Sequence, residues 1–418
     1  MKKKYNILIA LGSFKDVFSP KESCKILEDA VKNAIDCNIE CITMADGGEY
    51  SHDVMKQNTQ CITVDVPHVV TPHGKKVTVS YLLIDNTTAF VGASEILRMT
   101  QEYDAYKNPL NLTSFGLGQL VDDATKKGAT EIIIGLGGTN TVDAGIGMAQ
   151  ALGARFLDEN NDILVPTQGE YFTGKDLENI YDIDCKDVME KYGTISLKTL
   201  CDGDITLEEM YIPTNQKISA EYDVERNAIH KKLSHGIQSY CNVVERKSSV
   251  SREDDKTLQC QRFYGVAGAI NLSLKALFPK TMLLLGVDYF IELVKLEEKI
   301  KNADLVITGE GRFDNSLMGK TPIGISRLAK KHGKPVVYMC GDVDDSLKKC
   351  FTSSIAFTLP QDILDSGVST LISCHKYYEN PPEEEHNKED KNLLYRHNTP
   401  KIFSEALREY FTTKKLEL

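Results

Sequence analysis

The stretch "LVITGEGRFDNSLMGKTPIG", residues 305–324, starts as an apolar run and continues directly into glycines and charged residues. A continuous apolar run of this length is typical of a strand that is buried on both faces, as in a parallel sheet covered by helices. Residues 322–332 then show the apolar spacing of an amphipathic helix. The stretch therefore predicts a strand–loop–helix unit, with Glu310, Arg312 and Asp314 at the edge of a sheet.

Other apolar runs in the chain end in the same way. They are "YNILIALGSFK" (5–15), "ECITMADGGE" (40–49), "EIIIGLGGTNTVDAG" (131–145), "LKTLCDGD" (197–204) and "VVYMCGDVDD" (336–345). Amphipathic helical segments lie between these runs, and the clearest begins at Ser19–Glu22, a capping box with proline at the first helical position. The alternation of strand, loop and helix predicts an α/β fold.

Residues 61–92 follow a different pattern, because apolar and polar residues alternate there between turns at 72–74 and 85–86. This alternation predicts antiparallel or mixed sheet. A chain of 418 residues is also long enough for two domains, so we expect the mixed sheet to belong to a second one. The acidic, proline-containing segment 376–400 is predicted to be a solvated loop, with helical spacing resuming at 401–411.

Composition limits the kinds of partner. The net charge of −11 argues against nucleic acid, because duplex binding needs clustered cations. The 11 cysteines are an odd number and form no C-x-x-C pair, which favours reduced thiols in a reducing compartment. The apolar run after residues 1–4 is too short for a signal peptide or a membrane span. We therefore expect a cytoplasmic protein with no nucleic-acid or membrane partner.

Ligands of a parallel sheet collect beyond the carboxyl ends of its strands, so the loops after these runs are expected to lie close together. In "GLGGTNTVDAGIG" (135–147), donors from Gly137, Gly138, Thr139 and Thr141 could meet a phosphate at the start of the following helix. The segment is neither a Walker A motif nor a dinucleotide fingerprint. A tight strand-to-helix turn explains the glycines equally well, and both interpretations stay open.

The other loops supply cations and carboxylates. Each of these charges, taken alone, is more often a solvated loop residue than a functional group. Their chemistry-bearing residues are Ser13, Lys15, Asp46, Glu49, Asp202, Glu310, Arg312, Asp314 and Lys320. Phosphoryl transfer uses such a set, because it needs cations and amides for the phosphate oxygens and a carboxylate for the acceptor's proton. Magnesium binds through one or two carboxylates plus phosphates, so no tight ligand spacing is expected.

Taken together, the motifs resemble those of the type I glycerate kinase family. The matching segments, in the family's order, are Gly12–Lys15, Met44–Glu49, Asn108–Leu110, Phe115–Leu120, Gly135–Gly145, Ala151–Phe156, Thr308–Asp314 and Gly319–Gly324. The resemblance runs from about residue 6 to residue 370.

The resemblance implies a Rossmann-like parallel-sheet domain, residues 1–64 and 286–418, and a second, smaller α/β domain with mixed sheet, residues 65–285. The active site would lie in the cleft between them. The implied activity is phosphorylation of D-glycerate by ATP with Mg²⁺, with 2-phosphoglycerate favoured over 3-phosphoglycerate as the product. A homodimer is left open.

The resemblance also implies roles for single residues. The substrate-binding residues would be Ser13, Lys15, Asp46, Glu49, Arg312 and Asp314. The nucleotide-binding residues would be Gly137, Gly138, Thr139, Thr141, Glu310 and Lys320. The magnesium ligands would be Asp46, Asp202 and Asp314, and the catalytic residues Lys15, Asp143, Asp202 and Arg312. Either Asp202 or Asp143 would be the base.

The chain also departs from the family pattern. The family's first-loop aspartate is Gly12 here, and glycines of the family are Ala144 and Ala269. The loop after Asp202 is shorter and lacks the family's glycines. Since a Cβ obstructs close backbone approach to phosphate, these changes leave two hypotheses. The protein is an active, divergent glycerate kinase, or it is a catalytically weak or altered-substrate relative that acts as a nucleotide-binding or regulatory protein.

Overall fold

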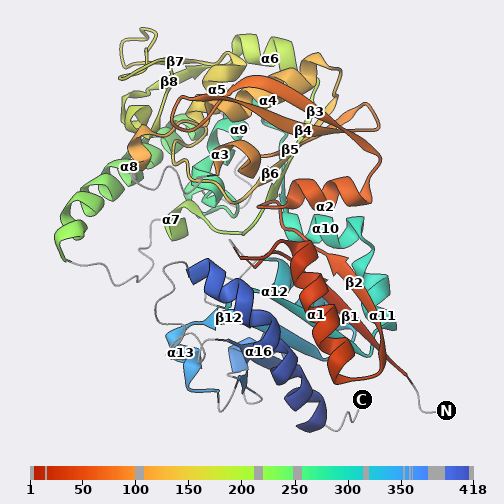
Figure 1. Ribbon diagram of the computed structural model, residues 1–418. Helices are drawn as coiled ribbons and strands as arrows, with labels where there is room; N and C mark the ends of the chain where they lie inside the picture. The colour runs from red at the N-terminus through yellow and green to blue at the C-terminus, as the bar shows by residue number, and fades with distance from the viewer. Residues whose placement is uncertain are drawn as a thin grey trace. The chain divides into compact units, whose positions relative to one another are not determined.

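The computed structural model describes residues 4–14, 17–98, 108–210, 220–247, 257–313, 320–351, 354–356, 359, 361–374 and 391–413. The chain forms two compact units (Figure 1). Unit 1 consists of Met1–Asp46 and Val287–Leu418, and unit 2 of Gly47–Gly286. Each unit contains its own six-stranded sheet.

The sheet of unit 1 has the strand order β13-β14-β12-β11-β1-β2. All of its neighbouring pairs are parallel except β13 with β14, so the predicted parallel sheet is confirmed. The strands are β1 (Tyr5–Leu11), β2 (Cys37–Thr43), β11 (Leu305–Phe313), β12 (Val336–Val343), β13 (Ile355–Ala356) and β14 (Thr370–Ser373).

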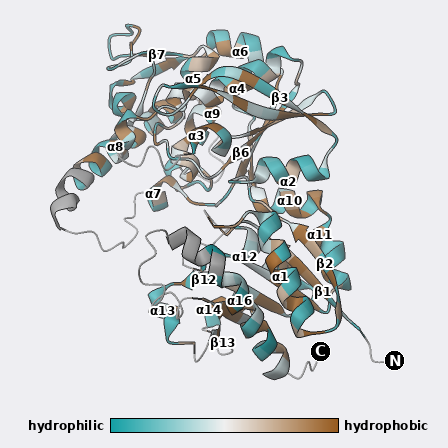
Figure 2. Cartoon of the chain, viewed as in Figure 1, coloured by the Kyte–Doolittle hydropathy of each residue, from teal (hydrophilic) through white to brown (hydrophobic). Residues whose placement is uncertain are grey.

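Helices cover both faces of this sheet. They are α1 (Pro20–Ala34), α10 (Gly286–Leu293), α11 (Leu296–Asn302), α12 (Thr321–Lys331), α13 (Asp345–Lys348), α14 (Gln361–Asp365) and α16 (Lys391–Thr413). Ile9 of β1 packs in one apolar cluster with Leu27 of α1 and Phe403 of α16. Tyr338 of β12 packs in another with Ile323 of α12. Burial on two faces explains the continuous apolar runs, and Figure 2 shows these strands in brown beside helices that carry teal.

Two local predictions can be compared with unit 1. The capping box at the start of α1 is present, because Ser19 accepts from Glu22 N and the Glu22 carboxylate accepts from Ser19 N. The predicted acidic loop extends too far, since α16 begins at Lys391 rather than after residue 400. Asn398 and Thr399 are buried in this helix, which packs along α1, so tertiary contact stabilises a turn whose sequence looks polar.

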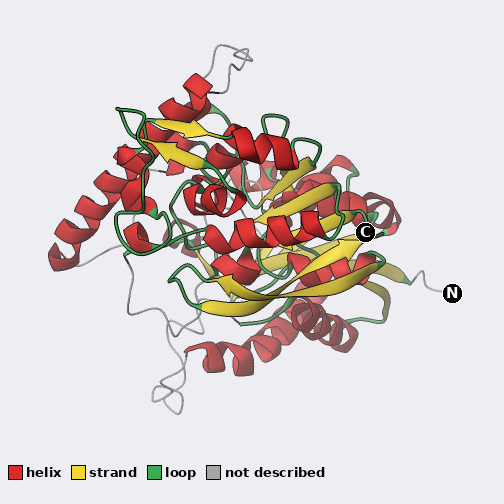
Figure 3. Ribbon diagram, turned by 90° about the horizontal axis from the view of Figure 1, so that it is seen from above, coloured by secondary structure: helices red, strands yellow, loops and turns green. Residues whose placement is uncertain are grey.

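The sheet of unit 2 has the order β10-β9-β6-β5-β4-β3. Strands β10, β9, β6 and β5 run parallel, while β4 and β3 are antiparallel to their neighbours, so the predicted mixed sheet is confirmed. The strands are β3 (Cys61–Val70), β4 (Lys76–Ile84), β5 (Thr88–Gly92), β6 (Glu131–Leu136), β9 (Ser196–Cys201) and β10 (Met282–Leu285). The short β7 (Arg155–Leu157) and β8 (Asp182–Asp184) form a separate ladder, visible as an isolated pair of strands in Figure 3.

Among the helices of unit 2, α3 and α4 lie next to the loops discussed below. The full set is α2 (Ser51–Asn58), α3 (Ser94–Leu97), α4 (Phe115–Lys126), α5 (Ile146–Leu152), α6 (Lys186–Tyr192), α7 (Leu207–Met210), α8 (Ala220–Lys247) and α9 (Asn271–Leu277). Single 3-10 turns occupy Pro109–Asn111, Gly174–Asn179, Leu258–Cys260 and Val266–Ala269. Among the described residues, no helix combines the length and apolar character needed to cross a bilayer.

The domain boundaries and sizes differ from the prediction. The first boundary falls between Asp46 and Gly47 instead of after residue 64, and the second falls beside its expected position. The reason is that α2 packs on β4 and β5, and β3 is the edge strand of the second sheet. Gly47, with φ of +96°, lies so close to β9 that a Cβ would come within 2.1 Å of the Leu200 carbonyl oxygen. Unit 2 is the longer unit, as the predicted range 65–285 already was, so the expectation of a smaller second domain is wrong.

Candidate active site

In unit 1, the loops after β1 and β2 lie side by side. The Met44 amide donates to the Leu11 carbonyl oxygen at 2.8 Å, which continues the pairing of the two strands beyond their ends. Asp46 follows on the second loop, and its Oδ2 accepts from Thr321 Oγ1 at 3.1 Å at the first residue of α12. A carboxylate is favourable there because the amino end of a helix carries partial positive charge. Ser13, which follows β1, is half-buried.

The predicted charges on β11 are engaged within the same sheet. The hydroxyl of Tyr338, on β12, donates to Glu310 Oε1. Arg312 is opposite Asp342 in the register of the two strands, with 3.9 Å between its Nε and Asp342 Oδ2. Lys320 is half-buried immediately before α12. Unit 1 therefore gathers Ser13, Asp46 and Arg312 on loops or strand ends at the carboxyl edge of its sheet.

Two predicted residues of unit 1 cannot be placed. Lys15 and Asp314 lie outside the described residues. Their assigned roles, substrate binding and catalysis for Lys15 and substrate and metal binding for Asp314, stay predictions.

In unit 2, the glycine loop after β6 is flanked by carboxylates. Asp202 follows β9, and its amide donates to the Leu136 carbonyl oxygen at 3.1 Å. A Cβ on Gly137 would lie 2.6 Å from Asp202 Oδ2, and a Cβ on Gly138 would lie 2.8 Å from Glu49 Cγ. Each glycine is thus required because a carboxylate side chain packs where a Cβ would be. The two glycines therefore have a packing reason of their own, and the predicted contact of this loop with phosphate stays a prediction.

The same loop has backbone donors available. Within the part of the chain that the structure describes, the amides of Gly137, Gly138 and Thr139 donate no hydrogen bond, whereas Asn140 N donates to the Leu97 carbonyl oxygen at 3.1 Å. Consecutive unpaired amides at a strand end form an arrangement that suits an anion. Thr141 differs from them because it is buried, and its Oγ1 has no partner among the described residues.

Asp143 has a different environment from the other predicted acids. It is fully buried, and its carboxylate accepts four hydrogen bonds, from the amide and Oγ of Ser114 and from the amides of Gly145 and Gly147. Burial raises the pKa of Asp143 above its ordinary value. The hydrogen bonds act to lower this pKa but do not outweigh burial. The groups that donate to the Asp143 oxygens belong to residues at the starts of α4 and α5. This geometry argues against the predicted catalytic role and indicates a structural one.

Asp202, by contrast, is only half-buried at the end of its strand. Among the described residues there is no group of three or more His, Cys, Asp or Glu side chains that could hold a metal ion by themselves. Magnesium that arrives with a nucleotide needs only one or two carboxylates, and partly exposed acids such as Asp202 and Asp46 have the chemistry for that role.

Sequence reasoning missed several residues that contact predicted site residues, among them Thr321, Tyr338 and Arg98. Thr321 donates to Asp46, Tyr338 donates to Glu310, and Arg98 lies 3.3 Å from Glu49, measured from Nε to Oε1. A signal for Arg98 was present, because "AFVGASEILR" (89–98) begins as another apolar strand with a glycine at its carboxyl end. Thr321 and Tyr338 carried no such signal, since their partners are remote in sequence.

Comparison with known proteins agrees with this architecture. The model of the glycerate kinase family matches residues 7–366. The "Glycerate kinase" of Haemophilus influenzae is 30% identical over 383 residues, which cover 88% of this chain and 96% of the relative. The "Glycerate 2-kinase" of Escherichia coli is 32% identical over 350 residues, which cover 82% of this chain and 86% of the relative.

A solved structure is similar along the whole chain. The crystal structure of "putative glycerate kinase 2" from Salmonella typhimurium LT2 aligns with a TM-score of 0.65 and 25% identity, and the alignment covers 99% of this chain and all of that one. The fold and these similarities therefore define a two-unit α/β kinase, a transferase. The chain belongs to the glycerate kinase family, which confirms the resemblance drawn from its motifs.

Proposed function

We propose that this protein transfers the γ-phosphoryl group of ATP to a hydroxyl of D-glycerate, giving ADP and phosphoglycerate, with 2-phosphoglycerate as the favoured product. The observation that carries the proposal is the loop Gly137–Thr139, whose amides donate to no other described residue. Such amides are oriented before the ligand arrives, so they stabilise phosphate oxygens without reorganisation. Phosphoryl transfer depends chiefly on this kind of positioning and charge stabilisation.

Asp202 is our proposed general base. Its side chain packs on Gly137, beside the donors, and is partly exposed. In the proposed step, Asp202 accepts the proton of the glycerate hydroxyl while the hydroxyl oxygen bonds to the γ-phosphorus and ADP departs. Asp143 is the weaker candidate because its oxygens already accept four hydrogen bonds. When bound, Mg²⁺ would neutralise phosphate charge, and Asp46, Asp202 and Asp314 are its proposed carboxylate ligands.

At two of the departures from the family pattern, the backbone has the left-handed conformation that favours glycine. Ala144 and Ala269, which replace glycines of the family, have φ of +50° and +67°. Both side chains are fully buried, so they do not obstruct the exposed side of a phosphate loop. These alanines strain the backbone more than they would block a ligand. This supports the active enzyme over the weak relative.

One departure favours the alternative function. Gly12 removes a carboxylate from the first loop, and a Cβ there would meet nothing closer than 3.8 Å. The chain therefore has room for a larger residue but lacks the charged group. A catalytically weak or altered-substrate relative, acting as a nucleotide-binding or regulatory protein, is the second candidate for this reason.

The test is a turnover assay on the purified full chain with ATP and D-glycerate, with and without Mg²⁺. ADP formed in quenched reactions reports turnover and its dependence on Mg²⁺. In a second step with Mg²⁺ present, added enolase converts 2-phosphoglycerate to phosphoenolpyruvate directly, whereas 3-phosphoglycerate gives phosphoenolpyruvate only after a phosphoglycerate mutase is added. Magnesium-dependent turnover that needs no mutase is the expected result. ATP binding by calorimetry without turnover on glycerate would overturn the kinase proposal in favour of the second candidate.

A further inference from the structure

We propose that Arg98 is a substrate-binding residue, whose guanidinium acts with the amides of Gly137–Thr139 to hold an anion. The anion is either the phosphate chain of the nucleotide or the carboxylate of the acceptor acid. This inference rests on the proposed function and adds to it a cation that none of the predicted site motifs contains.

Hydrogen bonds attach the segment before Arg98 to the end of β6 and to the glycine loop that follows it. The Ala93 amide donates to the Gly135 carbonyl oxygen at 2.9 Å, and the Asn140 amide donates to the Leu97 carbonyl oxygen at 3.1 Å. The two hydrogen bonds thus connect both ends of the segment 93–97, which contains α3, to residues 135 and 140. Arg98 directly follows Leu97, so its backbone is held beside the end of the loop.

The side chain of Arg98 is held by a residue that also packs on the loop. Glu49 Oε1 lies 3.3 Å from Arg98 Nε, and Glu49 Cγ lies where a Cβ of Gly138 would be. The Glu49 side chain is 11% exposed and that of Arg98 is 37% exposed. The Glu49 side chain is therefore mostly buried against the glycine, while the Arg98 side chain is partly exposed.

Charge gives the reason for a cation at this position. The carboxylates of Glu49 and Asp202 pack on Gly138 and Gly137, so an anion that approaches the amides meets two negative charges. Like charges at such short range repel strongly where the surroundings exclude water. Arg98 offsets the charge of Glu49, and its planar group of five donors matches phosphate and carboxylate oxygens.

The opposing explanation is that Arg98 and Glu49 form an ion pair of no functional consequence, as many surface pairs do. The matched control is Arg155, another arginine of unit 2, which is 43% exposed and 2.8 Å from Asp184. Arg155→Gln removes a comparable ion pair from the strand β7, which belongs to the separate two-stranded ladder. It should leave ligand binding unchanged.

The experiment measures binding of inorganic tripolyphosphate and of D-glycerate to the full-length wild type, Arg98→Gln, Arg98→Lys and Arg155→Gln by calorimetry. Melting temperatures verify that each variant is folded. We expect Arg98→Gln to lower the affinity for one of the two ligands roughly tenfold or more. Arg98→Lys should lower that affinity less, because lysine keeps the charge but lacks the planar set of donors. Loss of tripolyphosphate binding identifies the nucleotide phosphates as the anion, and loss of D-glycerate binding identifies the acceptor carboxylate.

Unchanged binding of both ligands in Arg98→Gln would overturn the inference, as would a wild type that binds neither. A parallel loss in Arg155→Gln would overturn it too, because the effect would then be one of general charge. The steady-state KM for ATP should rise if tripolyphosphate binding is weakened. The KM for D-glycerate should rise if D-glycerate binding is weakened. If the wild type binds tripolyphosphate through Arg98 but does not turn over D-glycerate, the proposed function fails while the role of Arg98 stands.

Discussion

Ser114 and Asp143 are joined by two hydrogen bonds, from the Ser114 amide at 2.7 Å and the Ser114 Oγ at 2.8 Å, both to Asp143 Oδ2. The same hydroxyl accepts from the Met148 amide at 2.9 Å. Because Ser114 precedes α4 and Met148 lies in α5, this small network fixes the starts of two helices relative to each other. Asp143 thus orders the loop that follows the glycines.

Replacing Asp143 with alanine should destabilise unit 2. The change leaves the amides of Ser114, Gly145 and Gly147 without their buried acceptor, which costs about 3 kcal/mol of unfolding free energy. Thermal melting should show a clear drop, with turnover per folded molecule largely kept at low temperature. An unchanged melting temperature together with lost turnover would instead return Asp143 to the list of catalytic residues.

Replacing Asp202 with asparagine should have the opposite effect, namely a loss of turnover with stability kept. The amide keeps the size of the side chain but removes the proton acceptor, so kcat should fall at least about 100-fold with little change in melting temperature. Asp204→Asn is the control, since Asp204 is two residues further along, 37% exposed and 4.0 Å from Arg262. Restoration of the rate of Asp202→Asn by excess Mg²⁺ would assign the loss to metal binding, the other role proposed for Asp202, and would contradict its role as the base.

Ala144 offers a test of backbone strain. A residue with a side chain at φ of +50° costs about 1–2 kcal/mol relative to glycine, which adopts this conformation freely. Ala149 is the control, because it is equally buried but lies in the regular helix α5. Both substitutions to glycine lose one buried methyl group, and Ala149→Gly also loses about 1 kcal/mol of helix propensity, so Ala144→Gly should be more stable than Ala149→Gly by about 2–3 kcal/mol in denaturant unfolding. A difference of about 1 kcal/mol or less would show that Ala144 is not strained.

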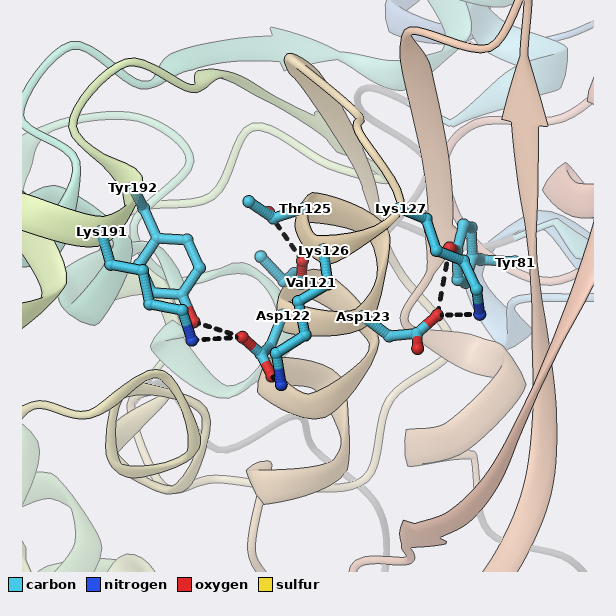
Figure 4. A network of polar contacts seen from close by, with 9 residues as sticks. All are labelled: Tyr81, Val121, Asp122, Asp123, Thr125, Lys126, Lys127, Lys191 and Tyr192. Atoms are coloured by element: carbon cyan, nitrogen blue, oxygen red, sulfur yellow. Dashed lines mark hydrogen bonds and ion pairs between the residues drawn. The ribbon is translucent and has the colours of Figure 1, made fainter.

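Adjacent aspartates of α4 hold that helix on two sides (Figure 4). Asp122 Oδ1 accepts from Lys191 Nζ and from the Tyr192 hydroxyl, each at 2.6 Å, and Lys126 Nζ lies 2.6 Å from its Oδ2. Asp123 accepts from the Tyr81 hydroxyl and from Lys127. Burial acts to raise the pKa of Asp122, but the hydrogen bonds from Lys126, Lys191 and Tyr192 outweigh it and lower the pKa.

The lowered pKa of Asp122 predicts a pH dependence of stability. A carboxyl group whose pKa is lower in the folded state contributes stability above its unfolded pKa, and that contribution is lost as the pH falls through the folded pKa. Asp122→Asn should therefore be less stable than the wild type by about 1 kcal/mol at pH 7. Melting curves from pH 7 to pH 3 should show this difference shrinking from about pH 4 downward.

Asp187→Asn is the control for this pH series, because the Asp187 side chain is 61% exposed and lies 3.5 Å from Arg155. Exposed ion pairs of this kind contribute little to the free energy of unfolding, so the melting temperature of this variant should match that of the wild type at every pH. A gap between wild type and Asp122→Asn that stays constant down to pH 3 would contradict the assignment of its stabilising effect to the ionised carboxylate.

The sequence by itself determined the fold class and which loops carry the chemistry. A strand covered by helices on both faces must be continuously apolar, so β1, β6, β9, β11 and β12 were recognisable without any tertiary information. The glycines and charges that interrupt each run mark its carboxyl end, which is where ligands of parallel sheets bind. These signals are local, because each is contained within one strand and the loop that follows it.

Only the tertiary structure decided how single residues are used. Asp143 and Asp202 are both aspartates of glycine-containing loops, yet one is fully buried and the other partly exposed, because Ser114 reaches Asp143 from 29 residues away. Thr321 meets Asp46 across 275 residues, and the first domain boundary depends on the packing of Gly47 against Leu200. The physical reason is that burial and hydrogen bonding of a side chain depend on groups that remote segments bring to it, and its local sequence does not encode them.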